Sequence, residues 1–472
     1  MTRIQSLIAL LVAASCCATA AEFQIGAATI DITPDQPVAL DGQRNVRIAT
    51  EAKSRIYATV LALESGTEQA IMVACDLVAI RSGILQKVRD KVAPRLPGFD
   101  PRNLFLSATH THTAPVTIAG RYSLPDEGIM QPEAYAEWMI ARMAEGIVTA
   151  WKERRPGKVG WAQSQAVIAQ NRRVTYANGS AVMYGKVQTP EFRGLEGYED
   201  HNVDVLFFWD LQDKLLATAI NVPCPSQEVG GSSYIHADFW DPVRTQLRAK
   251  HGLDLHVLAW TGAAGDHTSR MMVGSAADER MRKLRGGLSR LDELGRRIVL
   301  AWEDAHACAA KDVRLDPILE HRVEDIQLPW REVTILERAA AMTEAASFAK
   351  DPKQHWNYRW NQSVVDRFAA QKNGTAGSYG MELHTLRLGD VAIATNDFEL
   401  FTDYGVQMKA RSPAVQTFVI QLAGPGSYLP TERAVKGGGY SAVIQSSHVG
   451  PEGGQVLVER TVEALNHLWT KE

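Results

Sequence analysis

Cysteine is scarce in this chain, which has 5 in 472 residues. Cys16 and Cys17 lie in an N-terminal apolar segment, and the other three are Cys75, Cys224 and Cys308. So few cysteines, and an odd number of them, do not form the disulfide framework of a small secreted scaffold. At most one bridge can form among the last three, so at least one thiol is either a buried apolar side chain or a metal ligand.

Long apolar runs, strong net charge and linkers are also missing. Beyond the N-terminus no run approaches the roughly 18 apolar residues of a membrane-spanning helix, so we expect no transmembrane segment. The formal net charge is -4 without a basic stripe, which argues against nucleic acid as a partner. No Pro/Gly/Ser-rich stretch, charge block or repeat divides residues 22–472. We therefore expect one large domain, although its length exceeds the roughly 250–300 residues of a typical single core.

The first 21 residues have the pattern of an export signal. Arg3 supplies a positive start, and residues 7–14 form an apolar run that is too short to span a bilayer. Small residues then offer a cleavage site before Glu22. We predict that residues 1–21 are a signal peptide and that the mature protein is secreted or periplasmic. A lipid anchor on Cys16 or Cys17 is less favoured, because Ala13 stands where lipidation usually has Leu.

Strand-like apolar runs alternate with helical patterns along the chain. Strands are expected at 24–33, 56–64, 70–75, 104–109, 203–209, 217–222, 255–260, 323–328, 383–388 and 391–395. Helices are expected at 83–92, 132–153, 241–251, 287–309, 332–372 and 455–468. This alternation predicts an α/β fold of mixed α+β layers.

A histidine pair follows the expected strand 104–109, in the segment ATHTHTAP at 108–115. Side chains at i and i+2 of extended backbone share a face, so His110 and His112 should point into one cleft. Both can bind a metal, or one can bind while the other moves protons. The pair does not continue as the His-x-His-x-Asp-His of metallo-β-lactamase-like enzymes, because Ala114 and Pro115 stand there. Amidohydrolase barrels carry such a pair on their first strand, whereas several strands precede it here.

The segment THTHTAP at 109–115 resembles the Thr-His-Thr-His-Ser-Gly-Pro signature of neutral and alkaline ceramidases. The segment GAATIDITP at 26–34 is similar to the N-terminal Gly-x-Ala-Asp-Ile-Thr-Pro of that family. Further matches follow in the same order over nearly all of residues 22–472, without the C-terminal β-domain of typical ceramidases. The resemblance implies a single ceramidase-like catalytic domain that uses Zn²⁺ to hydrolyse the amide of an N-acylated lipid.

The resemblance further implies a zinc ion held by two His, a Glu and a Tyr. His110 matches the first His, Glu399 in NDFELFT at 396–402 matches the Glu, and Tyr428 matches the Tyr. Asp397 is a weaker rival to Glu399, because an acid at a strand-to-helix junction usually caps the helix.

The second zinc-binding His of the family has no direct counterpart. The matching segment, NVPCPSQ at 221–227, has Cys224 in its place. A thiolate can bind zinc, whereas a free Cys is more often a small buried side chain. His236 is the other nitrogen that could complete the site, so both residues remain candidates.

Zinc with an open position activates water and polarises a carbonyl, and His112 is expected to handle the protons. The turn GDHTS at 265–269 resembles the Gly-Asp-Val-Ser-Pro segment of the family, with Thr268 at the Ser position. We expect Thr268 to position the substrate, with direct attack by its hydroxyl as the minor alternative. Backbone amides of such a turn can hold an oxyanion, and Asp266 and His267 can reach the substrate or brace the turn.

Asn171 and Arg172 resemble an Asn-Arg pair of the family whose Arg faces the substrate. The resemblance implies that Arg172 fixes a substrate oxygen or, together with Tyr428, stabilises the tetrahedral intermediate. A solvated surface pair is the alternative.

These observations favour an exported zinc-dependent hydrolase that cleaves the amide of a small-molecule or lipid substrate. One alternative is an esterase, or a hydrolase of another acylated metabolite or glycan. A second is a non-catalytic exported binding protein with a structural metal, which a closed four-ligand site would favour. The presence of both His110 and His112 argues against it, because a closed site does not need the second histidine.

Overall fold

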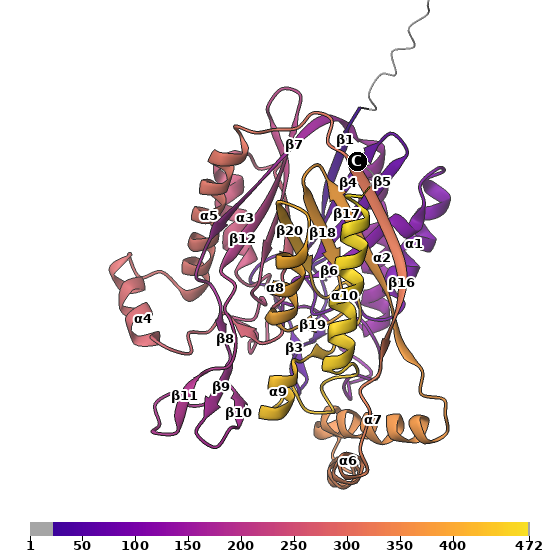
Figure 1. The fold of residues 1–472 in the computed structure, drawn as a ribbon, viewed down its shortest axis with the longest axis vertical. Helices are drawn as coiled ribbons and strands as arrows, with labels where there is room; N and C mark the ends of the chain where they lie inside the picture. The colour runs from indigo at the N-terminus through magenta and orange to yellow at the C-terminus, as the bar shows by residue number, and fades with distance from the viewer. Residues whose placement is uncertain (1–21, 471–472) are drawn as a thin grey trace, which may run out of the picture.

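The computed structural model describes residues 22–470, and the predicted signal peptide at 1–21 lies outside this range. Strands form the centre of the molecule and helices lie around them (Figure 1). The mixed α/β architecture predicted from the sequence is confirmed.

The larger sheet has eight strands in the order β14-β13-β12-β7-β1-β4-β5-β6. Their bounds are β1 Gln24–Asp31, β4 Tyr57–Ser65, β5 Glu68–Cys75, β6 Leu104–Ala108, β7 Arg155–Gln165, β12 Asn202–Asp210, β13 Leu215–Val222 and β14 His256–Thr261. Only the pairs β5–β6 and β13–β14 are parallel. Strands β1 and β7 pair only at Gln24–Pro156 and Ile25–Arg155, so the sheet divides into two halves at this point. The halves face each other, because β14 at one edge also contacts β4 and β5 of the other half.

A second sheet has four strands in the order β16-β17-β18-β20. Their bounds are β16 Leu319–Pro329, β17 Ser378–Leu388, β18 Val391–Thr395 and β20 Gln416–Ile420. Apolar side chains of both sheets form one core, in which Phe105 and Trp260 from the larger sheet lie with Phe418 from the smaller one, all fully buried. Burial of such large side chains is the main force that holds the sheets together.

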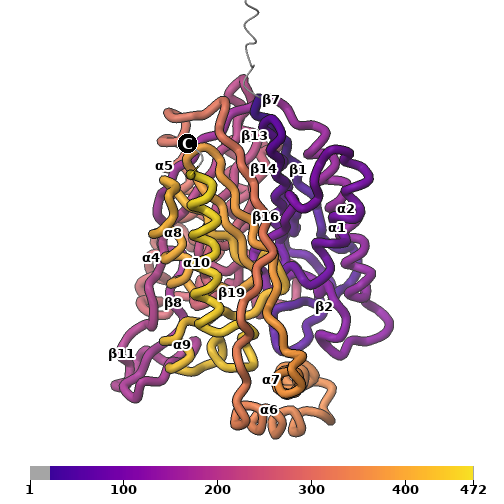
Figure 2. The backbone as a smooth tube through the Cα atoms, turned by 45° about the vertical axis from the view of Figure 1, so that its right-hand side comes forward, coloured from indigo at the N-terminus to yellow at the C-terminus, as the bar shows by residue number. Residues whose placement is uncertain are grey.

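Helices cover the outer faces of the sheets. α1 (Ile84–Val92) and α2 (Pro132–Lys152) pack on one half of the larger sheet, and α3 (Trp240–His251) and α5 (Arg290–Ala309) pack on the other. α8 (Thr402–Arg411) and α10 (Pro451–His467) cover the smaller sheet, on the side of the molecule away from α1 and α2 (Figure 2).

The remaining strands and α-helices complete the fold. They are β2 Val38–Leu40, β3 Arg47–Ala49, β8 Gln170–Asn171, β9 Arg173–Tyr176, β10 Ala181–Met183, β11 Phe192–Leu195, β15 His267–Thr268, β19 Glu399–Leu400, β21 Tyr428–Leu429, α4 Ser275–Leu284, α6 Ile335–Phe348, α7 His355–Lys372 and α9 Glu432–Gly437. The helical excursion predicted at 332–372 is the pair α6 and α7, which projects from one end of the molecule (Figure 1). Within residues 22–470 no helix is both long and apolar enough to cross a membrane.

Among the strands of the two main sheets, β7 and β20 were not predicted from the sequence. Strand β7 contains Pro156, Gly157 and Gly160 and is only partly buried, so it lacks the apolar run by which strands are recognised. Gly157 is needed, because a Cβ there would lie 2.4 Å from the side chain of Ile25 and 2.6 Å from the backbone oxygen of Trp209. A Cβ at Gly160 would make a tight contact, 3.1 Å from the side chain of Trp209.

The segments that leave β6, β14, β18 and β20 meet at one place. The amide of Ala108 at the end of β6 donates to the carbonyl of Leu422 after β20 (3.2 Å), and the amide of Gln421 donates to Thr261 at the end of β14 (3.0 Å). The buried side-chain oxygen of Gln421 accepts the amides of Leu400 (3.0 Å) and Ala264 (3.2 Å). These bonds bring residues from distant parts of the chain to one pocket.

Candidate active site

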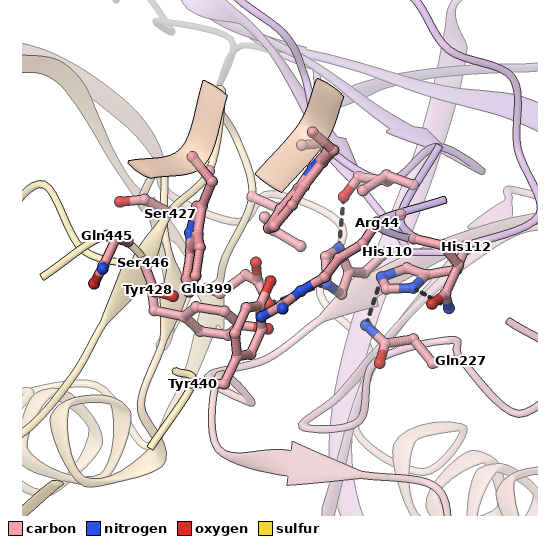
Figure 3. A pocket seen from close by; sticks show the side chains of 18 of the residues that line it. Arg44, His110, His112, Gln227, Glu399, Ser427, Tyr428, Tyr440, Gln445 and Ser446 are labelled. Carbon is pink, nitrogen blue, oxygen red and sulfur yellow. Dashed lines mark hydrogen bonds and ion pairs between the residues drawn. The ribbon is translucent and has the colours of Figure 1, made fainter. Parts of the chain in front are cut away.

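A cavity of about 720 Å³ lies at this meeting point, and His110, His112, Arg172, Glu399 and Tyr428 all line it. Figure 3 shows both histidines entering the cavity from one side and Glu399 and Tyr428 from the other. The structure therefore brings five of the residues predicted from the sequence to one site.

His110 follows a strand, as predicted, but the extended backbone expected at His110 is wrong. Strand β6 ends at Ala108, and His110 has a left-handed backbone with φ of 65°. A non-glycine residue is rarely found there, and such backbone is concentrated at functional sites. The ring is held by the carbonyl of Val78, 2.7 Å from its Nδ1, and its Nε2 lies 3.1 Å from Glu399 Oε2.

Glu399 and Tyr428 lie side by side because the two-residue strands β19 and β21 pair in parallel, with these residues as direct partners. Burial raises the pKa of Glu399, but His110 in its protonated form, the charge of Arg172 and hydrogen bonds from His110 and Tyr428 bring it below its ordinary value. Burial raises the pKa of Tyr428 well above its ordinary value. Without a metal, the site therefore holds a carboxylate beside a neutral phenol.

Arg172 is buried behind this pair. Its Nη2 donates to the carbonyl of Gly265 (2.8 Å) and to the hydroxyl of Tyr428 (3.1 Å), and lies 3.9 Å from Glu399 Oε2. Burial alone would lower the pKa of Arg172, but Tyr428, Tyr184 and Glu399 raise it above its ordinary value, so the guanidinium stays charged. The surface-pair alternative for Arg172 is thus wrong.

His112 is half-buried in the cavity wall between two glutamine amides. Its Nε2 lies 2.9 Å from Gln227 Nε2 and its Nδ1 lies 3.4 Å from Gln43 Nε2. Burial and the neighbouring His110 hold the pKa of His112 well below its ordinary value. The proton-transfer role of His112 stays a prediction. It requires that one ring nitrogen leave its glutamine partner and contact the substrate instead.

Four further predicted residues lie behind the wall and do not line the cavity. Asp266 accepts the amide (2.9 Å) and the hydroxyl (2.8 Å) of Thr402 and the Asn171 amide group (2.7 Å). The buried ring of His267 lies 2.9 Å from the carbonyl of Pro223 and 3.1 Å from that of Tyr198. The buried Thr268 hydroxyl lies 3.3 Å from that of Tyr184. In this structure they brace the turn after β14 instead of facing a substrate.

The structure does not bring Cys224 or His236 to this cavity. Cys224 is fully buried in the apolar core under α3 and α5, where burial raises the pKa of its thiol well above the ordinary value. The buried ring of His236 packs beside Tyr234. Its charged neighbours are Asp241 on α3 and Asp76, which follows β5. The rival carboxylate Asp397 lines a separate cavity and accepts the hydroxyl of Tyr379 (3.0 Å).

Within residues 22–470, no three His, Cys, Asp or Glu side chains gather closely enough to hold a metal ion. The donors that do meet are the imidazole of His110, the carboxylate of Glu399 and the phenol of Tyr428. The carbonyl of Val78 takes the Nδ1 hydrogen of His110, so a neutral ring presents a lone pair to Glu399 Oε2. Two such acceptors 3.1 Å apart need a proton or a cation between them. A nitrogen and two oxygens suit Zn²⁺, and catalytic zinc sites take three protein ligands, so this donor set fits.

Several residues of the cavity were missed by the sequence reading, among them Gln43, Arg44, Gln227, Arg270 and Tyr440. Gln227 stands three residues after Cys224 in the segment matched to the second zinc-binding His. A polar side chain at this position, just before a glycine-rich loop, was a signal from which Gln227 could have been predicted as a site residue. The other four belong to no recognisable motif.

No protein-family model and no curated protein matches this sequence. Solved structures that are similar in fold include two ceramidases. Neutral ceramidase from Pseudomonas aeruginosa superposes with a TM-score of 0.69 at 16% identity, over 95% of this chain and 74% of that one. A ceramidase complexed with C2 gives a TM-score of 0.67 at 15% identity, over 95% and 75%. This chain therefore has the fold of the neutral ceramidases.

Proposed function

We propose that this protein is an exported, zinc-dependent hydrolase that cleaves an amide bond of an N-acylated substrate. The observation that carries the proposal is the convergence of His110 Nε2, Glu399 Oε2, Tyr428 and Arg172 on one wall of an open cavity. The similarity in fold to neutral ceramidases supports amide hydrolysis as the reaction. The N-terminal segment 1–21 supports export.

His110, Glu399 and Tyr428 would hold the zinc ion. When bound, zinc supplies Lewis acidity toward a carbonyl oxygen and toward water. The turn after β14 holds this set in place, because Gly265 accepts Arg172 through its carbonyl and donates its amide to Leu400 (2.7 Å) next to Glu399.

Arg172 and Tyr428 would stabilise the negative charge that develops on the amide oxygen. Hydrolysis adds water to the carbonyl carbon, breaks the C–N bond, and gives a carboxylic acid and an amine. The guanidinium of Arg172 is already fixed by Gly265 and Tyr428, so it needs no reorganisation when the charge appears. His112, on the opposite side, would pass a proton to the leaving nitrogen.

The test is hydrolysis by the mature protein after removal of metal and after reloading with Zn²⁺. We expect amine release from N-acyl substrates that is lost on chelation and restored by zinc, whereas His110→Gln stays inactive. His467→Gln, which changes an exposed histidine on α10, is the matched control. Inactivity of the zinc-loaded protein on a panel of both amides and esters would overturn the enzyme proposal, and cleavage of esters alone would favour an esterase.

A further inference from the structure

Arginines dominate the charged side chains of the cavity. Five of them line it, namely Arg44, Arg81, Arg121, Arg172 and Arg270. Among the described residues, the only carboxylate that lines it is Glu399. A substrate that enters this cavity therefore meets an excess of positive charge.

Three of the five lie beside a carboxylate of the protein, and two of these share one. Arg81 (2.7 Å) and Arg121 both pair with Asp41, which lies buried behind the wall. Burial raises the pKa of Asp41, but these two guanidiniums hold it well below its ordinary range, so it stays charged. Arg172 lies near Glu399, as described above. Arg44 and Arg270 are left without a carboxylate partner in the part of the chain that the structure describes.

The guanidinium of Arg44 is held by aromatic rings instead. Its central carbon lies 4.6 Å from the ring centre of Tyr440, 4.8 Å from that of Trp360 and 5.1 Å from that of Trp356. Cation–π contacts occupy the faces of a guanidinium and leave its N–H groups free at the edge. Within residues 22–470 no acceptor takes a hydrogen bond from Arg44, which reaches toward Tyr440 and Glu399 in Figure 3.

Arg270 lines the same cavity. Its central carbon lies 5.4 Å from the ring centre of Tyr184, and the hydroxyl of Tyr184 lies 3.4 Å from Arg172 Nη1. Tyr440 in turn packs edge-on against Tyr428, with ring centres 5.8 Å apart. Aromatic side chains thus link each unpaired arginine to the residues of the proposed active site.

We propose that the amide cleaved here carries a carboxylate, as an N-acyl amino acid does, and that Arg44 binds it with Arg270 as a second cation. This inference rests on the proposed hydrolase function. A planar carboxylate matches the N–H fork of Arg44 in a bidentate contact. A neutral N-acyl lipid bound over Arg44 and Arg270 would remove water from the two guanidiniums without supplying an anion. This desolvation costs free energy.

The test compares N-lauroylglycine with two analogues, the neutral N-lauroylethanolamine and the phosphate ester of that compound. We expect kcat/KM for N-lauroylglycine to exceed that for the neutral compound by about tenfold or more, and to fall with added salt. Arg44→Gln should reduce this ratio by about tenfold. Arg338→Gln, which removes a guanidinium stacked on Phe368 outside the cavity, is the control and should leave the ratio as it is.

Equal kcat/KM for the charged and neutral amides would overturn this inference and leave the proposed hydrolase function intact. A preference for the phosphate ester over the carboxylate would also overturn it, because the anion would then be a phosphate. If no amide is cleaved, the hydrolase proposal fails. Calorimetric titration with N-lauroylglycine then still tests whether Arg44 binds a carboxylate. Binding that is no tighter than that of the neutral analogue, or that Arg44→Gln does not weaken, counts against it.

Discussion

At the scale of single residues, the chemistry of this site depends on a few side chains that other groups of the protein already hold in position. Tyr428 receives a hydrogen bond from Arg172 Nη2 (3.1 Å) while its ring is flanked by Tyr440. His110 is aimed at Glu399 by the carbonyl of Val78. Side chains held in this way lose little freedom when a substrate binds, which favours catalysis.

Removal of the Tyr428 hydroxyl is expected to impair turnover more than folding. Tyr428→Phe keeps the buried ring but loses the group between Arg172 and Glu399. We expect kcat to fall by about 10²-fold or more, as for loss of one oxyanion donor. Steady-state kinetics with an N-acyl substrate and thermal melting measure both effects. Tyr198→Phe, at an exposed position, is the control, and equal kcat values in the two variants would contradict the role of Tyr428.

Cys224 and His236 allow a direct test of the ligand set. Cys224→Ala should keep its zinc and lose about 1 kcal/mol of unfolding free energy, because it only shortens a buried apolar side chain. His236→Ala should also keep its zinc, whereas His110→Ala should lose it. Metal analysis of the purified variants measures this. Loss of zinc from Cys224→Ala, with His110→Ala still loaded, would show that the metal lies elsewhere.

At the scale of elements, the site depends on contacts between turns. The turn after β14 packs directly on β19, since a Cβ added to Gly265 would lie 2.2 Å from the carbonyl oxygen of Glu399. These short elements have no sequence signature. A two-residue strand such as β19 or β21 has no periodicity, and its pairing exists only because β18 and β20 carry it into place.

Gly265→Ala is therefore expected to displace Glu399 and to reduce activity by more than tenfold. The clash involves backbone atoms, which cannot move aside as the end of a flexible side chain can. Hydrolysis rates and zinc affinity should both fall. Gly377→Ala, with nothing within 4 Å of the added Cβ, is the matched control. Unchanged activity in Gly265→Ala would show that the turn does not position Glu399.

At the scale of the whole molecule, the buried histidines make stability depend on pH. His321 is buried between the two sheets, with its Nε2 3.1 Å from His384 Nδ1. Burial, with the neighbouring His384, lowers the pKa of His321 to about 3. Between about pH 6.5 and 3, His321 is therefore protonated in the unfolded chain and neutral in the folded chain.

Unfolding free energy should consequently fall on acidification through this window, by about 1.4 kcal/mol per pH unit from His321 alone. Denaturant titrations at pH 7, 6 and 5 measure the slope. His321→Asn should have a shallower slope whatever its absolute stability. The exposed His467→Gln should keep the slope of the unaltered protein. An unchanged slope in His321→Asn would mean that His321 is not the group that titrates.

The sequence by itself determined the α/β class, most of the long strands and helices, and five of the residues around the cavity. Apolar periodicity and the motif at 108–115 are local, so they can be read along the chain. Only the tertiary structure decided that Cys224 is buried in a core and that Gln227 stands beside His112. It also placed Arg44 and Arg270 at the same cavity as Glu399. These facts depend on contacts between residues far apart in sequence, which packing alone establishes.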